Sequence, residues 1–112
     1  MKGERQICLP DLIRRHVRET IEQSCRVEEV ARHFYYHPKY LSQLFKKESG
    51  QPLSEFIASV RMERAKELLR HTDRPVEAIA LQLGFSSSQH FYKRFRQQFG
   101  TTPIRYRNQL RG

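Results

Sequence analysis

The sequence predicts an all-α protein in which two helix-turn-helix lobes are joined by a long shared helix. Apolar residues recur every three or four positions along most of the 112-residue chain, while strand-like alternation is nearly absent. A short helix, a turn and a longer basic helix are predicted twice, about 50 residues apart. Because the two copies flank one long periodic segment, about seven helices are expected, with that segment as the shared scaffold.

Four helices are predicted in the first part of the chain, over residues 10–24, 27–34, 38–50 and 53–71. Pro38 suits the first position of the third helix, because the N–H that proline lacks would be unpaired there. Gly50 can adopt the left-handed backbone conformation that ends a helix. The fourth helix has about 18 residues, so it would span roughly 27 Å.

Three shorter helices are predicted in the second part of the chain, over residues 76–83, 88–99 and 103–110. Gly84 and Gly100 are expected to end the first two of them. Phe91, Phe95 and Phe99 recur every four residues, which predicts the apolar face of the middle helix.

The chain is accordingly expected to consist of a lead-in over residues 1–9, a first lobe over 10–52, a linking helix over 53–71 and a second lobe over 72–112. Each lobe should be homeodomain-like. The second helix of a helix-turn-helix, here 38–50 and 88–99, is the recognition helix that lies in a DNA major groove in proteins with this motif. Recognition helices at the two ends of the linking helix could lie about one DNA turn apart, roughly 34 Å. One chain could then read two successive major grooves without needing a palindrome.

The two predicted turns differ in one residue. A helix-turn-helix needs a small residue near the middle of its first helix, and Ala31 and Ala80 occupy that position. It also favours glycine in the turn, where φ is positive, and Gly84 fits. Tyr35 takes that place in the first lobe. Either the first turn has another backbone shape, or Tyr35 carries a strain of about 1–2 kcal/mol.

The charge distribution indicates a polyanionic partner. Lysine and arginine number 21 against 12 acidic residues, which gives a formal net charge of +9. Glu77 is the last acidic residue, so the basic residues from position 78 to 112 have no acidic neighbour in sequence. Such an asymmetry is typical of nucleic-acid-binding domains, although a basic surface that is merely solvated is the alternative.

Each predicted recognition helix carries polar side chains opposite its apolar face. Leu41, Leu44 and Phe45 should point inward in the first helix, as should Phe91 and Phe95 in the second. The outward residues are then Lys39, Ser42, Gln43 and Lys46 in the first helix, and Ser88, Gln89, His90, Lys93 and Arg96 in the second. Long amides and cations can read guanine and adenine edges in a major groove. Each residue taken singly could also be an ordinary solvent-facing side chain.

Other functions fit the sequence less well. The histidines are scattered and there is no glycine-rich phosphate loop, so neither an enzyme nor a cofactor is expected. A zinc site at Cys25, His33 and His37 would lack the paired-ligand spacing of zinc modules. The only other cysteine is Cys8, and two isolated cysteines fit reduced thiols in a cytoplasmic protein.

Membrane and RNA partners are also disfavoured. No apolar run approaches the roughly 20 residues needed to span a bilayer. The phenylalanines fall on core-facing stripes, whereas RNA stacking needs exposed rings. The tyrosines at positions 35, 36, 40 and 92 are less certain, and Tyr40 could reach DNA.

Two groups of residues carry a family resemblance. The first is the run 40–50 with Arg61–Ala65 and Leu68–Leu69; the second comprises Ile79–Ala80, Gly84–Phe85, Phe91, Arg94–Phe95, Gly100, Thr102–Pro103 and Tyr106–Arg107. Over essentially residues 10–110, the chain resembles the DNA-binding domain of AraC/XylS-type transcription regulators. The first half is also similar to the DNA-binding ends of AraC-type response regulators.

The resemblance implies specific contacts to double-stranded DNA. The implied base readers are Lys39, Tyr40, Ser42, Gln43, Ser88, Gln89, His90 and Lys93. The implied phosphate contacts are His37, Lys46, Lys47, Ser86, Ser87, Arg94 and Arg96. Serines at a helix start can both cap the helix and hold a phosphate.

The resemblance also implies partners beyond DNA. Members of this family often recruit RNA polymerase, and most carry a sensor or receiver domain before the DNA-binding domain. The chain is therefore expected to be the C-terminal domain of a longer regulator and to be monomeric on its own. A small stand-alone activator is the alternative.

Overall fold

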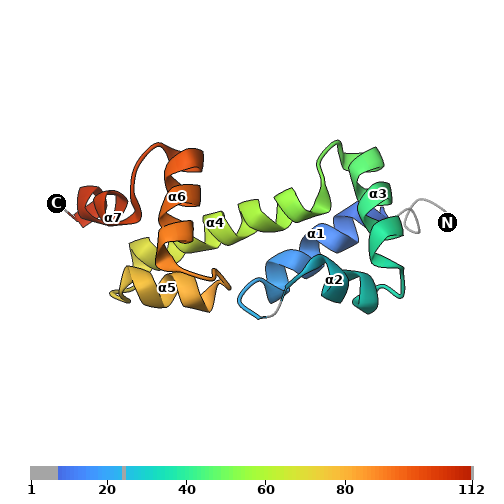
Figure 1. Ribbon diagram of the computed structural model, residues 1–112, viewed down its shortest axis with the longest axis horizontal. Helices are drawn as coiled ribbons and strands as arrows, with labels where there is room; N and C mark the ends of the chain where they lie inside the picture. Colours follow the sequence, from blue (N-terminus) through green and yellow to red (C-terminus); the bar gives the residue numbers. More distant parts are fainter. Residues whose placement is uncertain (1–7, 24, 112) are drawn as a thin grey trace. The chain divides into compact units, whose positions relative to one another are not determined.

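The computed structural model describes residues 8–23 and 25–111, which form seven α-helices and no strand (Figure 1). This confirms the predicted all-α class. In chain order the helices are α1 (Leu9–Thr20), α2 (Val27–His33), α3 (Pro38–Ser49), α4 (Leu53–His71), α5 (Val76–Gln82), α6 (Ser88–Phe99) and α7 (Pro103–Arg111).

The chain divides into two compact units between Val60 and Arg61, a position inside α4. The first unit holds α1, α2, α3 and the start of α4. The second unit holds the rest of α4 with α5, α6 and α7. Each unit has a buried core of its own, and the two cores share no residue. The helix α4 therefore supplies apolar side chains to both cores.

The core of the first unit forms where α1, α2 and α3 pack against one another. Ile13, Val30 and Phe45 are completely buried. Leu41 and Phe45 point inward from α3 as predicted, but Leu44 is only half-buried. The buried stripe of α3 is therefore narrower than the sequence suggested, and Leu44 lies on its flank.

The core of the second unit is rich in aromatic rings. Phe91 and Phe95 are completely buried, with ring centroids 5.8 Å apart. Arg107 of α7 fixes the end of α4, because its guanidinium donates to the carbonyls of Leu69 (3.1 Å), Thr72 (3.1 Å) and Arg74 (2.7 Å). The carbonyl of Leu69 belongs to the last turn of α4, where helical partners are missing, and those of Thr72 and Arg74 follow the helix.

The ends of the recognition helices confirm the signals at Ser87, Gly50 and Gly100, and His37 adds a cap that the sequence did not predict. His37 precedes α3, and its Nδ1 accepts a hydrogen bond from the backbone N–H of Lys39 at 3.2 Å. Ser87 precedes α6, and its Oγ accepts from the N–H of His90 at 3.1 Å. Gly50 and Gly100 end the two helices with φ of +81° and +75°.

The predicted end of the first helix is too late. α1 ends at Thr20, whose hydroxyl donates to the carbonyl of His16 at 2.8 Å. The N–H of Gln23 then donates to the Thr20 carbonyl at 2.8 Å, a tighter turn than an α-helix has. A threonine hydroxyl competes for backbone partners and favours such ends. The predicted limit at Ser24 lies outside the described residues.

The two helix-turn-helix turns have the same backbone shape. Tyr35 has φ of +62° and Gly84 has φ of +87°. In both turns the next residue closes a hydrogen bond to the alanine of the preceding helix, from Tyr36 to Ala31 (2.9 Å) and from Phe85 to Ala80 (3.0 Å). The alternative of a different shape is therefore wrong. Tyr35 adopts the strained conformation, and its side chain is 95% exposed.

We expect Tyr35→Gly to stabilise the first unit by about 0.5–1 kcal/mol, because relief of about 1–2 kcal/mol of strain exceeds the entropy cost of glycine. Gly84→Ala should destabilise the second unit by about 1 kcal/mol. An added Cβ at Gly84 would approach only Nε of Arg61, at 4.0 Å, so the cost there is conformational. Urea unfolding measures both effects, and a Tyr35→Gly variant less stable than the parent would contradict this reading.

Candidate nucleic-acid interface

Buried leucine and phenylalanine side chains decide which face of α3 is outward. Leu41 and Phe45 are fully buried, so residues on the opposite side of the helix meet solvent. Lys39, Gln43 and Lys46 are exposed and follow one another at intervals of four and three, which places them on one stripe. Of the other predicted contacts on this helix, Tyr40 and Lys47 are exposed and Ser42 is half-buried.

The same logic applies to α6, where Phe91 and Phe95 are the buried side chains. Gln89, Lys93 and Arg96 are exposed at intervals of four and three, so they also form one stripe. His90, Ser86 and Ser87 are exposed as well, while Ser88 and Arg94 are half-buried. Each recognition helix thus carries one amide and two cations along its outward stripe.

The serine and histidine predicted to contact phosphate are already part of helix caps. His37 Nδ1 accepts from Lys39, which leaves Nε2 to donate to an outside group. Ser87 Oγ accepts from His90, and its own hydroxyl proton remains available as a donor. Both caps therefore leave a donor at the start of a recognition helix, where the helix dipole favours an anion.

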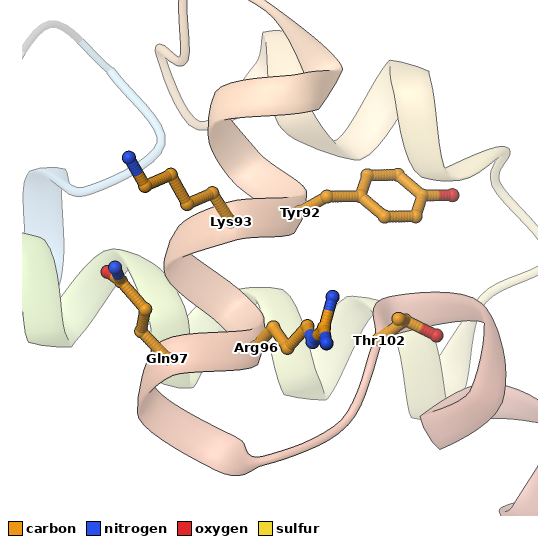
Figure 2. A pocket seen from close by; sticks show the side chains of 5 residues that line it. All are labelled: Tyr92, Lys93, Arg96, Gln97 and Thr102. Atoms are coloured by element: carbon orange, nitrogen blue, oxygen red, sulfur yellow. The ribbon is translucent and has the colours of Figure 1, made fainter.

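An open hollow of about 420 Å³ lies beside α6 (Figure 2). Its lining side chains are Tyr92, Lys93, Arg96 and Gln97 of α6, with Thr102 just before α7. Burial, and then the carboxylate of Glu77, raise the pKa of Tyr92. Its hydroxyl is thus a neutral donor at physiological pH. Tyr92, Gln97 and Thr102 were not predicted as site residues. The position of Thr102 beside α6 depends on how the chain turns from α6 into α7.

Some of the basic residues near the C-terminus serve the fold. Arg107 is committed to three backbone carbonyls. Arg111 pairs with the carboxylate of Asp73 at 2.5 Å and donates to the carbonyl of Thr72 at 2.7 Å. Arg107 and Arg111 therefore use part of the positive charge of the second unit within the fold, while Lys93 and Arg96 of α6 and Arg105 of α7 stay exposed.

His16 and His33 of the first unit form a separate feature. The rings of His16 and His33 stack with centroids 3.9 Å apart. Burial, and then the charge of His33, lower the pKa of His16, which favours its neutral form.

Over residues 8–23 and 25–111, no group of three or more histidine, cysteine or acidic side chains is arranged to hold a metal ion. Within the same residues, no helix is both long and apolar enough to cross a membrane.

Two helix-turn-helix units with outward stripes of amides and cations define the chain as a DNA-binding module of the duplicated helix-turn-helix class. Comparison with known sequences agrees, since residues 30–109 match the helix-turn-helix domain family. The chain is 41% identical to the regulatory protein PocR of Salmonella typhimurium over 96 residues, which are 86% of this chain and 32% of PocR. It is 38% identical to the regulatory protein SoxS of Escherichia coli K12 over 92 residues, which are 82% of this chain and 86% of SoxS.

Comparison with solved structures also indicates a DNA-binding domain of a transcription regulator. The C-terminal domain of AraT, a response regulator from Geobacillus stearothermophilus, superposes with a TM-score of 0.80 at 29% identity, covering 90% of this chain and 84% of that one. The chain belongs to the helix-turn-helix domain family of AraC-type transcription regulators. It spans about a third of PocR but most of SoxS.

Proposed function

We propose that the chain is the sequence-specific DNA-binding domain of a bacterial transcription regulator and acts on transcription initiation. In this proposal α3 and α6 each enter one of two successive major grooves. The observation that carries it is the duplicated arrangement, in which each recognition helix has two fully buried side chains on one face and a stripe of amide and cationic side chains on the other.

We assign direct base readout to the outward residues nearest the helix starts. These are Lys39, Tyr40, Ser42 and Gln43 of α3, and Ser88, Gln89, His90 and Lys93 of α6. A glutamine amide can bond adenine N6 and N7 together, and a lysine can donate to guanine O6 or N7. Phosphate contacts are assigned to His37, Lys46, Lys47, Ser86, Ser87, Arg94 and Arg96. These contacts would fix the position of the chain on the duplex without reading sequence.

The proposal extends to the longer protein. A further sensor or receiver domain would lie before this one, as the 32% coverage of PocR allows. The alternative is a small stand-alone activator, and the chain covers 86% of the regulatory protein SoxS. In either case we propose a non-enzymatic cytoplasmic regulator that contacts RNA polymerase, with this part of it monomeric on its own.

A competition assay separates duplex DNA from other anionic partners. Labelled duplex bound to the chain is challenged with duplex, an RNA hairpin or anionic vesicles at about 150 mM salt, where weak non-specific attraction is screened. Unlabelled duplex should compete best. Stronger competition by the hairpin or the vesicles would overturn the proposal.

Base readers and phosphate contacts should respond differently to truncation. Gln43→Ala is expected to cost about 1–3 kcal/mol of binding free energy on the preferred duplex and much less on random duplex. Lys46→Ala should weaken both duplexes alike, because a phosphate contact carries no sequence information. Fluorescence anisotropy on the two duplexes measures the difference. Equal losses for Gln43→Ala on both would mean that the recognition face is misplaced.

A further inference from the structure

Two exposed tyrosine rings lie together at the start of the first recognition helix. The ring centroids of Tyr36 and Tyr40 are 5.6 Å apart with an interplanar angle of 32°. Tyr36 is 38% exposed and Tyr40 is 54% exposed. The partly buried apolar residues that pack against the core of this unit are Leu9, Val27 and Phe34 instead. The tyrosine pair therefore presents ring surface to the solvent beside the first recognition helix.

The second unit repeats the ring pair with different chemistry. Phe85 and His90 occupy the matching positions, with centroids 5.5 Å apart in an edge-to-face arrangement. Phe85 is half-buried and packs against the core ring of Phe91 at 5.1 Å. One ring of that pair thus serves the core, and the other is a polar imidazole. Of the two matching sites, only the one in the first unit carries an exposed pair of phenol rings.

The position of the pair determines what it would meet in a complex. Tyr40 is the third residue of α3, one residue after Lys39 and one turn before Gln43. The first residues of a recognition helix contact base edges in the major groove. Along those edges the 5-methyl group of thymine is the apolar feature, and apolar side chains recognise it.

We propose that the Tyr36–Tyr40 pair selects thymine in the half-site read by α3, by packing the exposed surface of the two rings against its 5-methyl group. The proposal rests on the proposed function and adds a base identity to it. The second half-site has no matching preference, since His90 offers ring nitrogens rather than a second phenol ring.

DNA in which a single methyl group is removed or added tests the proposed recognition of thymine directly. The preferred duplex is first selected from a random pool with the 112-residue chain. Each thymine is then replaced in turn by deoxyuridine, which removes only the methyl group. One replacement in the α3 half-site should weaken binding about four- to tenfold. Placing 5-methylcytosine at a position where deoxycytidine weakens binding should restore part of the loss.

Variants connect the methyl group to the rings. Tyr40→Ala should lose as much affinity on the thymine duplex as the deoxyuridine replacement does, and should lose nothing further on the deoxyuridine duplex. Tyr40→Phe keeps the ring and should keep the sensitivity to the methyl group. Tyr35→Gly is a matched control, because it removes a neighbouring exposed tyrosine outside the pair. This variant should also keep the sensitivity to the methyl group. Circular dichroism confirms that each variant is folded.

The outcomes are distinguishable. A selected duplex whose α3 half-site is insensitive to deoxyuridine at every position overturns this inference and leaves the proposed function intact. So does a Tyr40→Ala variant that weakens all duplexes alike, since the ring would then contact the backbone. So does a Tyr40→Ala variant that retains full methyl sensitivity. A chain that selects no sequence at all overturns the proposed function as well.

Discussion

Phe95→Ala is expected to cost about 3–5 kcal/mol of the free energy of unfolding of the second unit. Phe95 is completely buried. Its ring centroid lies 5.8 Å from that of Phe91, 4.7 Å from Phe99 and 5.8 Å from Tyr106. Truncation would remove contacts to all three rings and leave a cavity between α6 and α7. Since the same helix carries Lys93 on its outer face, specific DNA binding should fall together with stability.

Because each unit has its own core, the destabilisation by Phe95→Ala should be confined to the second unit. Residues of the first core do not contribute to the second, so the first unit should stay folded in the Phe95→Ala variant. Urea unfolding followed by circular dichroism should then show an early step that the parent lacks. Leu81→Ala is the matched control, because Leu81 is 73% exposed and its loss should change stability little. A Phe95→Ala variant that loses under about 1 kcal/mol would contradict the assigned core.

Affinity for any duplex should fall steeply as salt is raised. We expect roughly 5–8 phosphates to be neutralised, which gives a slope of log affinity against log salt of about −4 to −7. Between about 50 and 200 mM salt, affinity would fall by a factor of roughly 250 to 16,000. Exposed Lys46, Lys47 and Arg96 are among the cations assigned to this effect.

Anisotropy titrations over that salt range measure the slope. Lys46→Gln should make it shallower by about one unit, because one fewer counterion is released. Arg111→Gln is a useful comparison, since Arg111 is already paired with Asp73 and should change the slope less. A slope near zero would remove the DNA-binding interpretation altogether.

The limits of a helix could be predicted where helix-breaking residues and the end of the apolar periodicity fall at the same position. The limits of α4, Leu53–His71, match the prediction because its apolar stripe is continuous and Thr72 to Pro75 cannot extend it. The end of α1 was missed, since the periodic pattern continues past Thr20 while the hydroxyl of that residue turns back to the helix. Local side-chain bonds of this kind are not visible in hydrophobic spacing.

The outward stripes of α3 and α6 could also be predicted, because their inward residues were assigned first. Exposure supports the placement of Gln43 and Lys93, while their contacts with DNA stay predictions. Features that join distant segments could not be predicted. The bonds of Arg107 to carbonyls more than 30 residues earlier depend on the folded path of the chain. From the sequence alone, Arg107 was therefore grouped with the basic residues that indicate a polyanionic partner.

Selection of bound duplexes from a random pool tests the central claim, that each unit reads bases through its own recognition helix. The parent chain should select two separate stretches of preferred sequence. Gln43→Ala should relax preference in one stretch and leave the other unchanged, and Lys93→Ala should do the reverse, each at one or two base pairs. A single selected stretch that both variants relax, or affinity losses that are equal on selected and random duplex, would contradict the account.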